Sequence, residues 1–122
     1  MGDEVISAVG HVIRDCMRAH DSAGRYGGDE FAVVCGNTQA GEARALAERI
    51  RTCVEDLRLP EQPDLRLTCS IGLAAAQTRH GNLRAWMHDA DAALYRAKND
   101  GRNQVSADAS TPAVSSAVPS TI

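Results

Sequence analysis

The sequence predicts one mixed domain of the α/β (α+β) class, in which helices pack on a largely antiparallel sheet. The 122 residues are enough for a single domain with a modest core. Apolar residues recur at helical spacing in some stretches and at strand-like spacing in the runs between them. A Gly-Gly turn links two of those runs as a hairpin, which favours antiparallel pairing.

A helix, a hairpin and a second helix are expected in the first half of the chain. Residues 3 to about 20 carry apolar side chains at helical spacing. Residues 23–26 and 31–35 are the expected arms of the hairpin around the glycines. Thr38 or a near neighbour suits the N-cap of the second helix, which is expected to end before Pro60.

A strand, a third helix and a short edge strand are expected in the second half. Residues 65–76 first alternate and then become continuously apolar, which predicts a strand. Residues 83–99 place apolar side chains on one helical face, and Gly101 suits the stop of that helix. Residues 103–105 are expected to form a last edge strand. The folded domain is therefore expected to span residues 1–105.

The remaining residues and the overall composition exclude several classes of function. Residues 106–122 are mostly Ser, Thr, Ala, Val and Pro, so we expect a disordered tail without function of its own. The net charge is -3 and no Lys/Arg run occurs, which argues against nucleic-acid binding. No signal peptide or bilayer-spanning apolar run is present. We expect a soluble, cytoplasmic chain, and a membrane tether on a longer parent protein stays open.

The cysteines show no metal-binding or disulfide pattern. Cys16, Cys35, Cys53 and Cys69 form no CxxC pair and no close Cys/His cluster. Three of them fall at apolar positions, which predicts buried, reduced thiols. Since aromatic residues make up only 3% of the chain, the core must be built from Ala, Leu, Val and Ile.

The most informative segment is residues 25–31, Arg-Tyr-Gly-Gly-Asp-Glu-Phe, followed by the apolar run 32–35. The glycines let the backbone turn sharply and let a phosphate ester approach closely. Asp29 and Glu30 supply the oxygen ligands that hard divalent cations prefer. In strand geometry their side chains point to opposite faces, so one can bind a metal while the other orients it. An ordinary solvated hairpin turn is the alternative interpretation.

Three separated segments together resemble the GGDEF domain of diguanylate cyclases, which condense two GTP into cyclic di-GMP. Residues 25–31 contain the name motif, residues 70–74 (Ser-Ile-Gly-Leu-Ala) look like the core strand, and residues 90–103 look like the late helix and its turn. The resemblance extends over residues 2–105. It implies a nucleotidyl-cyclase, palm-like fold with a largely antiparallel sheet covered by helices.

The resemblance implies roles for the turn. Asp29 and Glu30 match the catalytic acids that bind Mg²⁺ (or Mn²⁺), with Asp29 near the attacking 3′-hydroxyl of GTP. Gly27 and Gly28 match the glycines over which the GTP phosphates lie.

Three further residues match substrate-binding positions. Lys98 and Arg102 match two cations that grip the terminal phosphates, and a helix end followed by the Gly101 turn can aim both at one polyanion. Helix-dipole compensation and C-terminal capping are the alternative roles for this pair. Asp3 matches an aspartate that accepts the N1 and N2 protons of guanine, although it also suits a helix N-cap.

A product-inhibition site is also implied by the resemblance. Arg18 and Asp21 match the family's RxxD site in residue type and in distance from the Gly-Gly turn. In that site arginine binds a phosphate of cyclic di-GMP and aspartate binds guanine. Arg49 falls at a position that supplies a second arginine across a domain pair in relatives.

The family pattern starts earlier than this sequence. Its first strand carries a partner metal ligand, a Phe-Lys pair and an asparagine that contacts guanine, and none of these precedes Gly2 here. We therefore expect a fragment of a longer cyclase or a truncated remnant, with the first strand and helix missing. Loss of a central strand would expose unpaired backbone groups, so we expect residues 1–122 alone to fold poorly and to be inactive.

The function expected from the sequence is therefore a diguanylate cyclase that acts as a homodimer on GTP and is inhibited by cyclic di-GMP. The alternative is a non-catalytic module that binds cyclic di-GMP or GTP. A structural remnant without any ligand is a third hypothesis.

Overall fold

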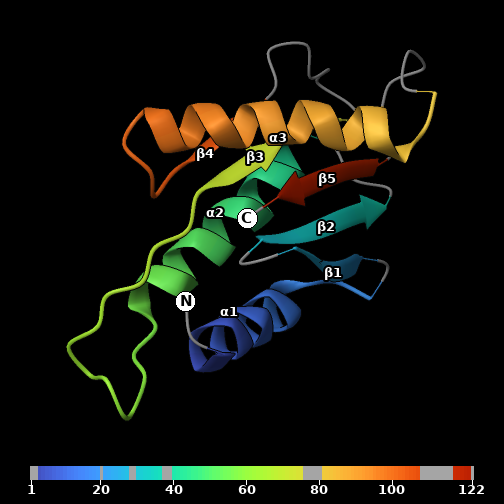
Figure 1. Cartoon of the computed structure of the whole chain (residues 1–122). Helices are drawn as coiled ribbons and strands as arrows, with labels where there is room; N and C mark the ends of the chain where they lie inside the picture. The colour runs from blue at the N-terminus through green and yellow to red at the C-terminus, as the bar shows by residue number, and fades with distance from the viewer. Residues whose placement is uncertain are drawn as a thin grey trace.

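Helices cover both faces of one five-stranded sheet in the computed structural model (Figure 1). The structure describes residues 3–19, 21–27, 30–36, 40–75, 81–107 and 117–121. Its elements are α1 (Asp3–Cys16), β1 (Ser22–Gly27), β2 (Glu30–Gly36), α2 (Ala40–Asp56), β3 (Ile71–Leu73), α3 (Leu83–Asn99), β4 (Val105–Ala107) and β5 (Ala117–Thr121). Figure 1 shows α3 along one side of the sheet and α1 on the opposite side. Within the described residues, no helix combines the length and the apolar character that crossing a membrane requires.

The sheet has the strand order β1-β2-β5-β3-β4. The pairs β1 with β2, β2 with β5 and β3 with β5 are antiparallel, whereas β3 and β4 are parallel. This arrangement confirms the predicted α+β class with a largely antiparallel sheet. Gly27 pairs with Glu30, so β1 and β2 form the predicted hairpin around the Gly-Gly turn.

Several element boundaries differ from the sequence prediction. The third helix has the predicted bounds, but α1 ends at Cys16 instead of near residue 20. Of the strand predicted at 65–76, the structure describes residues 65–75, and within these only Ile71–Leu73 is a strand. A strand needs a paired neighbour, and β4 and β5 pair with this stretch alone. The last edge strand begins at residue 105 instead of 103. Thr38, the predicted helix cap, lies outside the described residues.

The C-terminal segment also differs from the prediction. Residues 106–122 were expected to be disordered and the sheet was expected to lack a central strand, but Ala117–Thr121 forms β5 between β2 and β3. Val34 pairs with Pro119 on one side, and Gly72 pairs with Thr121 on the other. The physical reason is that the backbone N–H and C=O groups on the facing edges of β2 and β3 need hydrogen-bond partners, which β5 supplies. The domain boundary at residue 105 stays a prediction.

The main core lies between the sheet and the helices α1 and α2. It contains the buried residues Val5, Val9, Ile13, Cys16, Val33, Cys35, Ala43, Leu46, Ala47, Ile50, Val54, Cys69, Ile71, Leu73, Ala75 and Val105. All four cysteines are free thiols, and three of them are buried, as predicted, while Cys53 is exposed. Burial raises the pKa of Cys35 to about 11 and that of Cys69 to about 12.

The opposite face of the sheet packs against α3 through Gly72. A Cβ atom at this position would overlap the backbone oxygen of Ala90 and the backbone nitrogen of Leu94, and it would lie 2.8 Å from the Leu94 Cα. The absence of a side chain therefore lets the backbone of α3 lie directly on β3. The N-terminal end of α3 is capped as well, because the Asn82 side chain accepts a hydrogen bond from the Ala85 nitrogen at 2.9 Å.

We predict that Gly72→Ala destabilises the domain by about 2 kcal/mol or more, since the obstructing atoms belong to the backbone and cannot rotate away. Urea unfolding followed by circular dichroism measures this change. Gly24→Ala is the matched control, because Gly24 is also a strand residue and nothing lies within 4 Å of its added Cβ. Equal stability of the two variants would contradict the packing role of Gly72.

Candidate functional site

The start of β2 lies beside the C-terminal end of α3. Glu30 opens β2, and its Oε1 lies 3.9 Å from the Nζ of Lys98 in the last turn of α3. Both side chains are about one-third exposed, at 32% and 38%. Gly28 and Asp29 lie outside the described residues, while Gly27 closes the hairpin opposite Glu30. The structure thus brings together one predicted acid and one predicted phosphate-binding cation from distant parts of the sequence.

Arg102 follows α3 in a tight backbone reversal. Gly101, Arg102 and Asn103 have φ values of 122°, 63° and 48°, all in the left-handed region. The Arg102 nitrogen donates to the Ala97 oxygen at 2.9 Å, and the Asn103 nitrogen donates to the Ser70 Oγ at 3.1 Å. The backbone of Arg102 therefore caps α3, while its side chain is exposed. The capping role and the anion-binding role are compatible, because they use different atoms.

Asp3 lies in the first turn of α1 and is exposed. Among the described residues, no hydrogen bond or ion pair joins it to Glu30, Lys98 or Arg102. An acid in this position stabilises the positive end of the helix dipole. Its predicted role toward guanine stays a prediction.

The clearest preorganised site is formed by Arg18 and Asp21. The Asp21 side chain is fully buried, at 0% exposure, and accepts hydrogen bonds from the backbone nitrogen of Arg18 at 2.8 Å, from its Nε at 3.2 Å and from its Nη2 at 3.2 Å. The hydrogen bond to Asp21 raises the pKa of Arg18. The carboxylate therefore fixes the loop after α1 and orients the guanidinium.

Arg18 and Arg49 line the same pocket, which has a volume of about 210 Å³. Glu42, Ala45 and Leu46 of α2 complete its lining. The Nη1 of Arg18 lies 3.3 Å from the Glu42 Oε2, and the Nη2 of Arg49 donates to the backbone oxygen of Cys16 at 2.8 Å. Two guanidinium groups on one pocket suit an anion with planar or bidentate oxygens.

Sequence reasoning missed Glu42. This side chain is 56% exposed and comes from the first turn of α2, 24 residues after Arg18. No local pattern links the two residues, because the contact depends on how α2 packs beside the end of α1. An incoming anion would compete with Glu42 for Arg18.

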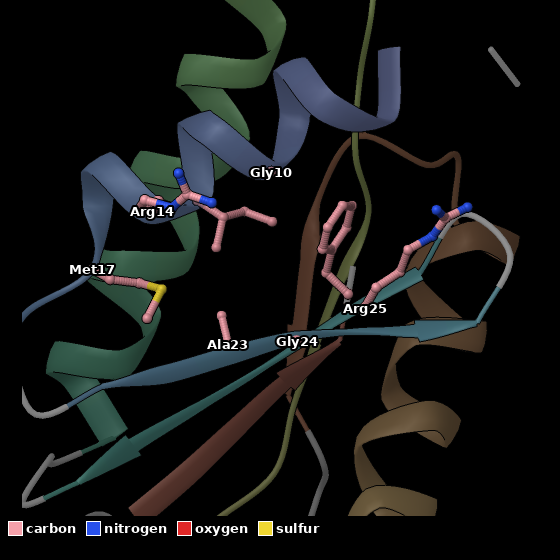
Figure 2. Close-up of a pocket in the computed structure, with 8 residues that line it drawn as sticks. Gly10, Arg14, Met17, Ala23, Gly24 and Arg25 are labelled. Carbon is pink, nitrogen blue, oxygen red and sulfur yellow. The ribbon is translucent and has the colours of Figure 1, made fainter. Parts of the chain in front are cut away.

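A second cavity, of about 270 Å³, lies between α1 and β1 (Figure 2). Its lining consists of Gly10, Ile13, Arg14, Met17, Ala23, Gly24, Arg25 and Phe31. Figure 2 shows Arg14 and Arg25 at opposite ends, with Met17 and Ala23 on the Arg14 side. Among the described residues, none of those predicted to bind substrate, metal or product lines this cavity.

The described residues supply only part of a metal site. Within them, no group of three or more His, Cys, Asp or Glu side chains is arranged to hold a metal ion. The carboxylate of Glu30 is a hard oxygen donor at the turn, so it fits a divalent cation such as Mg²⁺ or Mn²⁺ as one ligand. The adjacent Asp29 lies outside the described residues.

Comparisons with known proteins agree on one family. The family model "Diguanylate cyclase, GGDEF domain" matches residues 1–104. Diguanylate cyclase A of Treponema denticola is 40% identical over 105 residues, which are 85% of this chain and 28% of that protein. This chain therefore spans little more than a quarter of that relative's length.

Solved structures show the same fold. The GGDEF domain of DgcB from Caulobacter crescentus, in complex with c-di-GMP, is 34% identical with a TM-score of 0.79, covering 88% of this chain and 65% of that chain. The active GGEEF domain of a diguanylate cyclase from Vibrio cholerae is 29% identical with a TM-score of 0.80, covering 89% of this chain and 69% of that chain.

We predict that Asp21→Ala destabilises the domain by about 1–3 kcal/mol, because it leaves the backbone nitrogen of Arg18 without its buried acceptor. Glu42→Ala also removes a carboxylate partner of Arg18, but that carboxylate is largely exposed, so a change within about 0.5 kcal/mol is expected. Urea unfolding of both variants measures the difference. Similar stabilities would show that Asp21 does not anchor this loop.

Proposed function

Because this chain belongs to the GGDEF domain family, we propose that it is the GGDEF portion of a diguanylate cyclase, an enzyme in which two GTP are condensed into cyclic di-GMP and pyrophosphate. The observation that carries the proposal is the approach of Glu30 to Lys98, which joins the motif turn to the end of α3. A carboxylate that binds metal and an ammonium group that binds phosphate are both required where a triphosphate lies.

The motif turn is proposed to hold the reacting part of GTP. Asp29 and Glu30 supply carboxylate oxygens for a divalent metal ion, Mg²⁺ or Mn²⁺, and Gly27 and Gly28 leave room for the phosphates. When bound, the metal neutralises phosphate charge and favours ionisation of the attacking hydroxyl. The pairing of Gly27 with Glu30 places Glu30 at one end of the sheet, which orients this acid before substrate arrives.

The remaining substrate contacts are proposed at the helix ends. Lys98 and Arg102 bind the terminal phosphates, since both lie at the C-terminal end of α3 and both side chains reach solvent. Asp3 accepts the N1 and N2 protons of guanine, which selects guanine over adenine. Binding of GTP releases Lys98 from Glu30, so substrate and metal replace an ion pair that is already partly solvated.

The active assembly is proposed to be a homodimer in the cytoplasm. Each domain binds one GTP, and two domains face each other so that each 3′-hydroxyl attacks the α-phosphate of the other nucleotide. The two-fold symmetry of the product supports this arrangement. The cytoplasm supplies the GTP.

Product inhibition is proposed at the pocket of Arg18 and Arg49. The phosphates of cyclic di-GMP contact the guanidinium groups. The buried Asp21 carboxylate already accepts hydrogen bonds from Arg18, so it becomes open to a guanine edge only when the Arg18 side chain turns toward a phosphate. The preorganised Arg18 and the shared pocket support this assignment. A specific observation also favours a second candidate function, a non-catalytic cyclic di-GMP receptor, because this pocket is built entirely from residues away from the motif turn.

We predict that purified residues 1–122 form no detectable cyclic di-GMP from GTP and Mg²⁺. Asp29 and Glu30 provide too few ligands for two-metal phosphoryl transfer, and no larger cluster exists among the described residues. Chromatography of the reaction mixture measures the product. Turnover by residues 1–122 would contradict the predicted inactivity but would support the cyclase assignment.

A chimera tests the cyclase assignment directly. The segment that precedes the matched region in diguanylate cyclase A of Treponema denticola is fused ahead of residue 1. The chimera is expected to produce cyclic di-GMP, and the chimera with Asp29→Ala is expected to produce none. A folded chimera that binds GTP but gives no product would favour the receptor.

We predict that cyclic di-GMP binding to residues 1–122 is lost in Arg18→Ala and weakened about tenfold or more in Arg49→Ala, since each loses a charge-assisted contact. Isothermal calorimetry measures the affinity. Arg58→Ala is the matched control, because in the described part of the chain Arg58 donates to the backbone oxygens of Glu55 and Leu57 and is not among the residues that line the pocket. Unchanged binding in Arg18→Ala would refute the product site.

A further inference from the structure

Side chains protect the β4 edge of the sheet. The backbone oxygen of Gln104 bonds to β3, so the backbone oxygens of Val105 and Ala107 point away from β3. Both of these oxygens already accept a hydrogen bond. Arg44 donates its Nη2 to the Val105 oxygen at 3.4 Å, and Arg96 donates its Nη2 to the Ala107 oxygen at 3.1 Å. The two arginines therefore leave little room for a further strand at this edge.

The opposite edge of the sheet, β1, is accessible. It pairs with β2 on one side, and in the described part of the chain no strand lies on its other side. Residues 22–25 are all exposed, and nothing lies within 4 Å of a Cβ atom added at Gly24. In an edge strand, every second residue directs its backbone N–H and C=O groups away from the sheet. A further strand therefore has both space and hydrogen-bonding groups beside β1.

The cavity of about 270 Å³ between α1 and β1 lies at this accessible strand (Figure 2). Ala23 and Arg25 project to one face of the hairpin, and Phe31, the pairing partner of Arg25, projects to the same face. The Phe31 ring reaches α1, where a Cβ atom added at Gly10 would lie 3.6 Å from it. Phe31 and Met17 are only partly buried. Since a cavity of about 150 Å³ admits benzene, this cavity admits a leucine-sized side chain.

Arginine side chains lie at both ends of the cavity. Figure 2 shows Arg14 of α1 at one end and Arg25 of β1 at the other, and both side chains are exposed. Apolar side chains from α1 and the hairpin line the rest of the cavity. This arrangement is complementary to one apolar side chain between two acidic ones. Side chains two residues apart lie on one face of an extended strand, so the complementary order is acid, any residue, large apolar residue, any residue, acid.

We propose that β1 and this cavity form a docking site for an extended segment of a protein partner, which joins the sheet as a strand beside β1. The large apolar side chain of the segment enters the cavity, and its two acidic side chains contact Arg14 and Arg25. Backbone hydrogen bonds to β1 supply affinity, while the cavity and the arginines supply selectivity. No two acidic residues of this chain are four positions apart, so a second copy does not supply such a segment.

The experiment titrates residues 1–122 with the end-blocked peptide Thr-Glu-Thr-Leu-Thr-Glu-Thr and measures binding by calorimetry. Saturable binding of one peptide per chain is expected. Replacement of the leucine by alanine is expected to weaken binding about tenfold or more, because apolar burial in the cavity is lost. Replacement of both glutamates by lysine is expected to abolish binding. No binding at about 1 mM peptide, or equal affinities of the leucine and alanine peptides, would overturn the proposal.

Two N-methylated peptides test whether the segment pairs as a strand. One carries the methyl group on the leucine nitrogen, and the other carries it on the nitrogen of the next threonine. Because alternate N–H groups of a strand point to opposite sides, one methyl group is expected to block pairing with β1 and the other to leave it intact. Hydrogen exchange at residues 22–25 is expected to slow in the complex. Equal binding of the two N-methylated peptides would contradict strand addition.

Variants of the chain place the peptide on the structure. Ala23→Phe fills the cavity from an exposed position, so loss of binding with retained circular dichroism is expected. Arg14→Glu is expected to weaken binding about tenfold or more, and replacement of one particular glutamate of the peptide by lysine is expected to restore it. Arg58→Glu is the matched control, because Arg58 is exposed and does not line the cavity. If Arg14→Glu binds as tightly as Arg58→Glu, the peptide lies elsewhere and the proposal fails.

Two other occupants of the site predict different results. A small dianion contacts both arginines without strand pairing, so binding of the straight-chain dicarboxylate suberate as tightly as the peptide would assign the cavity to a small molecule. Dimerisation of residues 1–122 in analytical ultracentrifugation, abolished by Ala23→Phe, would assign the surface to a second copy. Either result overturns the proposal, whereas a monomeric chain that binds the peptide more tightly than suberate supports it.

Discussion

The direct packing of the α3 backbone on β3 at Gly72 is the contact on which the rest of the arrangement depends. Because no side chain separates helix and strand, the position of α3 is set by backbone atoms that cannot rotate away. The last turn of α3 carries Lys98, and the following reversal carries Arg102. The placement of Lys98 beside Glu30 therefore depends on a glycine that is distant from both residues in sequence.

The sheet joins two halves of the candidate site through β5. The pair β1 and β2 carries the motif turn, while β3 and β4 lie under the helix that carries Lys98. β5 lies between these pairs and hydrogen-bonds to both β2 and β3. It contains Pro119, which has no N–H to donate, so it is a weaker central strand than an uninterrupted one.

Local signals explain what the sequence predicted well. The bounds of α3 follow from its apolar periodicity and the Gly101 stop. The hydrogen bonds between Arg18 and Asp21 were not predicted, because the family resemblance assigned the two residues to different parts of a ligand. Contacts that depend on packing were missed. Glu42 meets Arg18 only because α2 lies beside the end of α1, and the composition of residues 117–121 gives no sign that they would enter the sheet. Residues 65–70 alternate between apolar and polar side chains, but in the described part of the chain no strand pairs with them. The alternation therefore predicted a strand that does not form.

The chain's single tryptophan lies where α3 packs against the end of β3. Trp86, in the first turns of α3, donates its indole Nε1 to the backbone oxygen of Ala74, just after β3, at 2.8 Å. Indole emission depends on hydrogen bonding and solvent exposure, so its wavelength and intensity report whether α3 is docked on the sheet. The domain thus contains an intrinsic optical probe of the helix position that sets its candidate site, and it needs no added label.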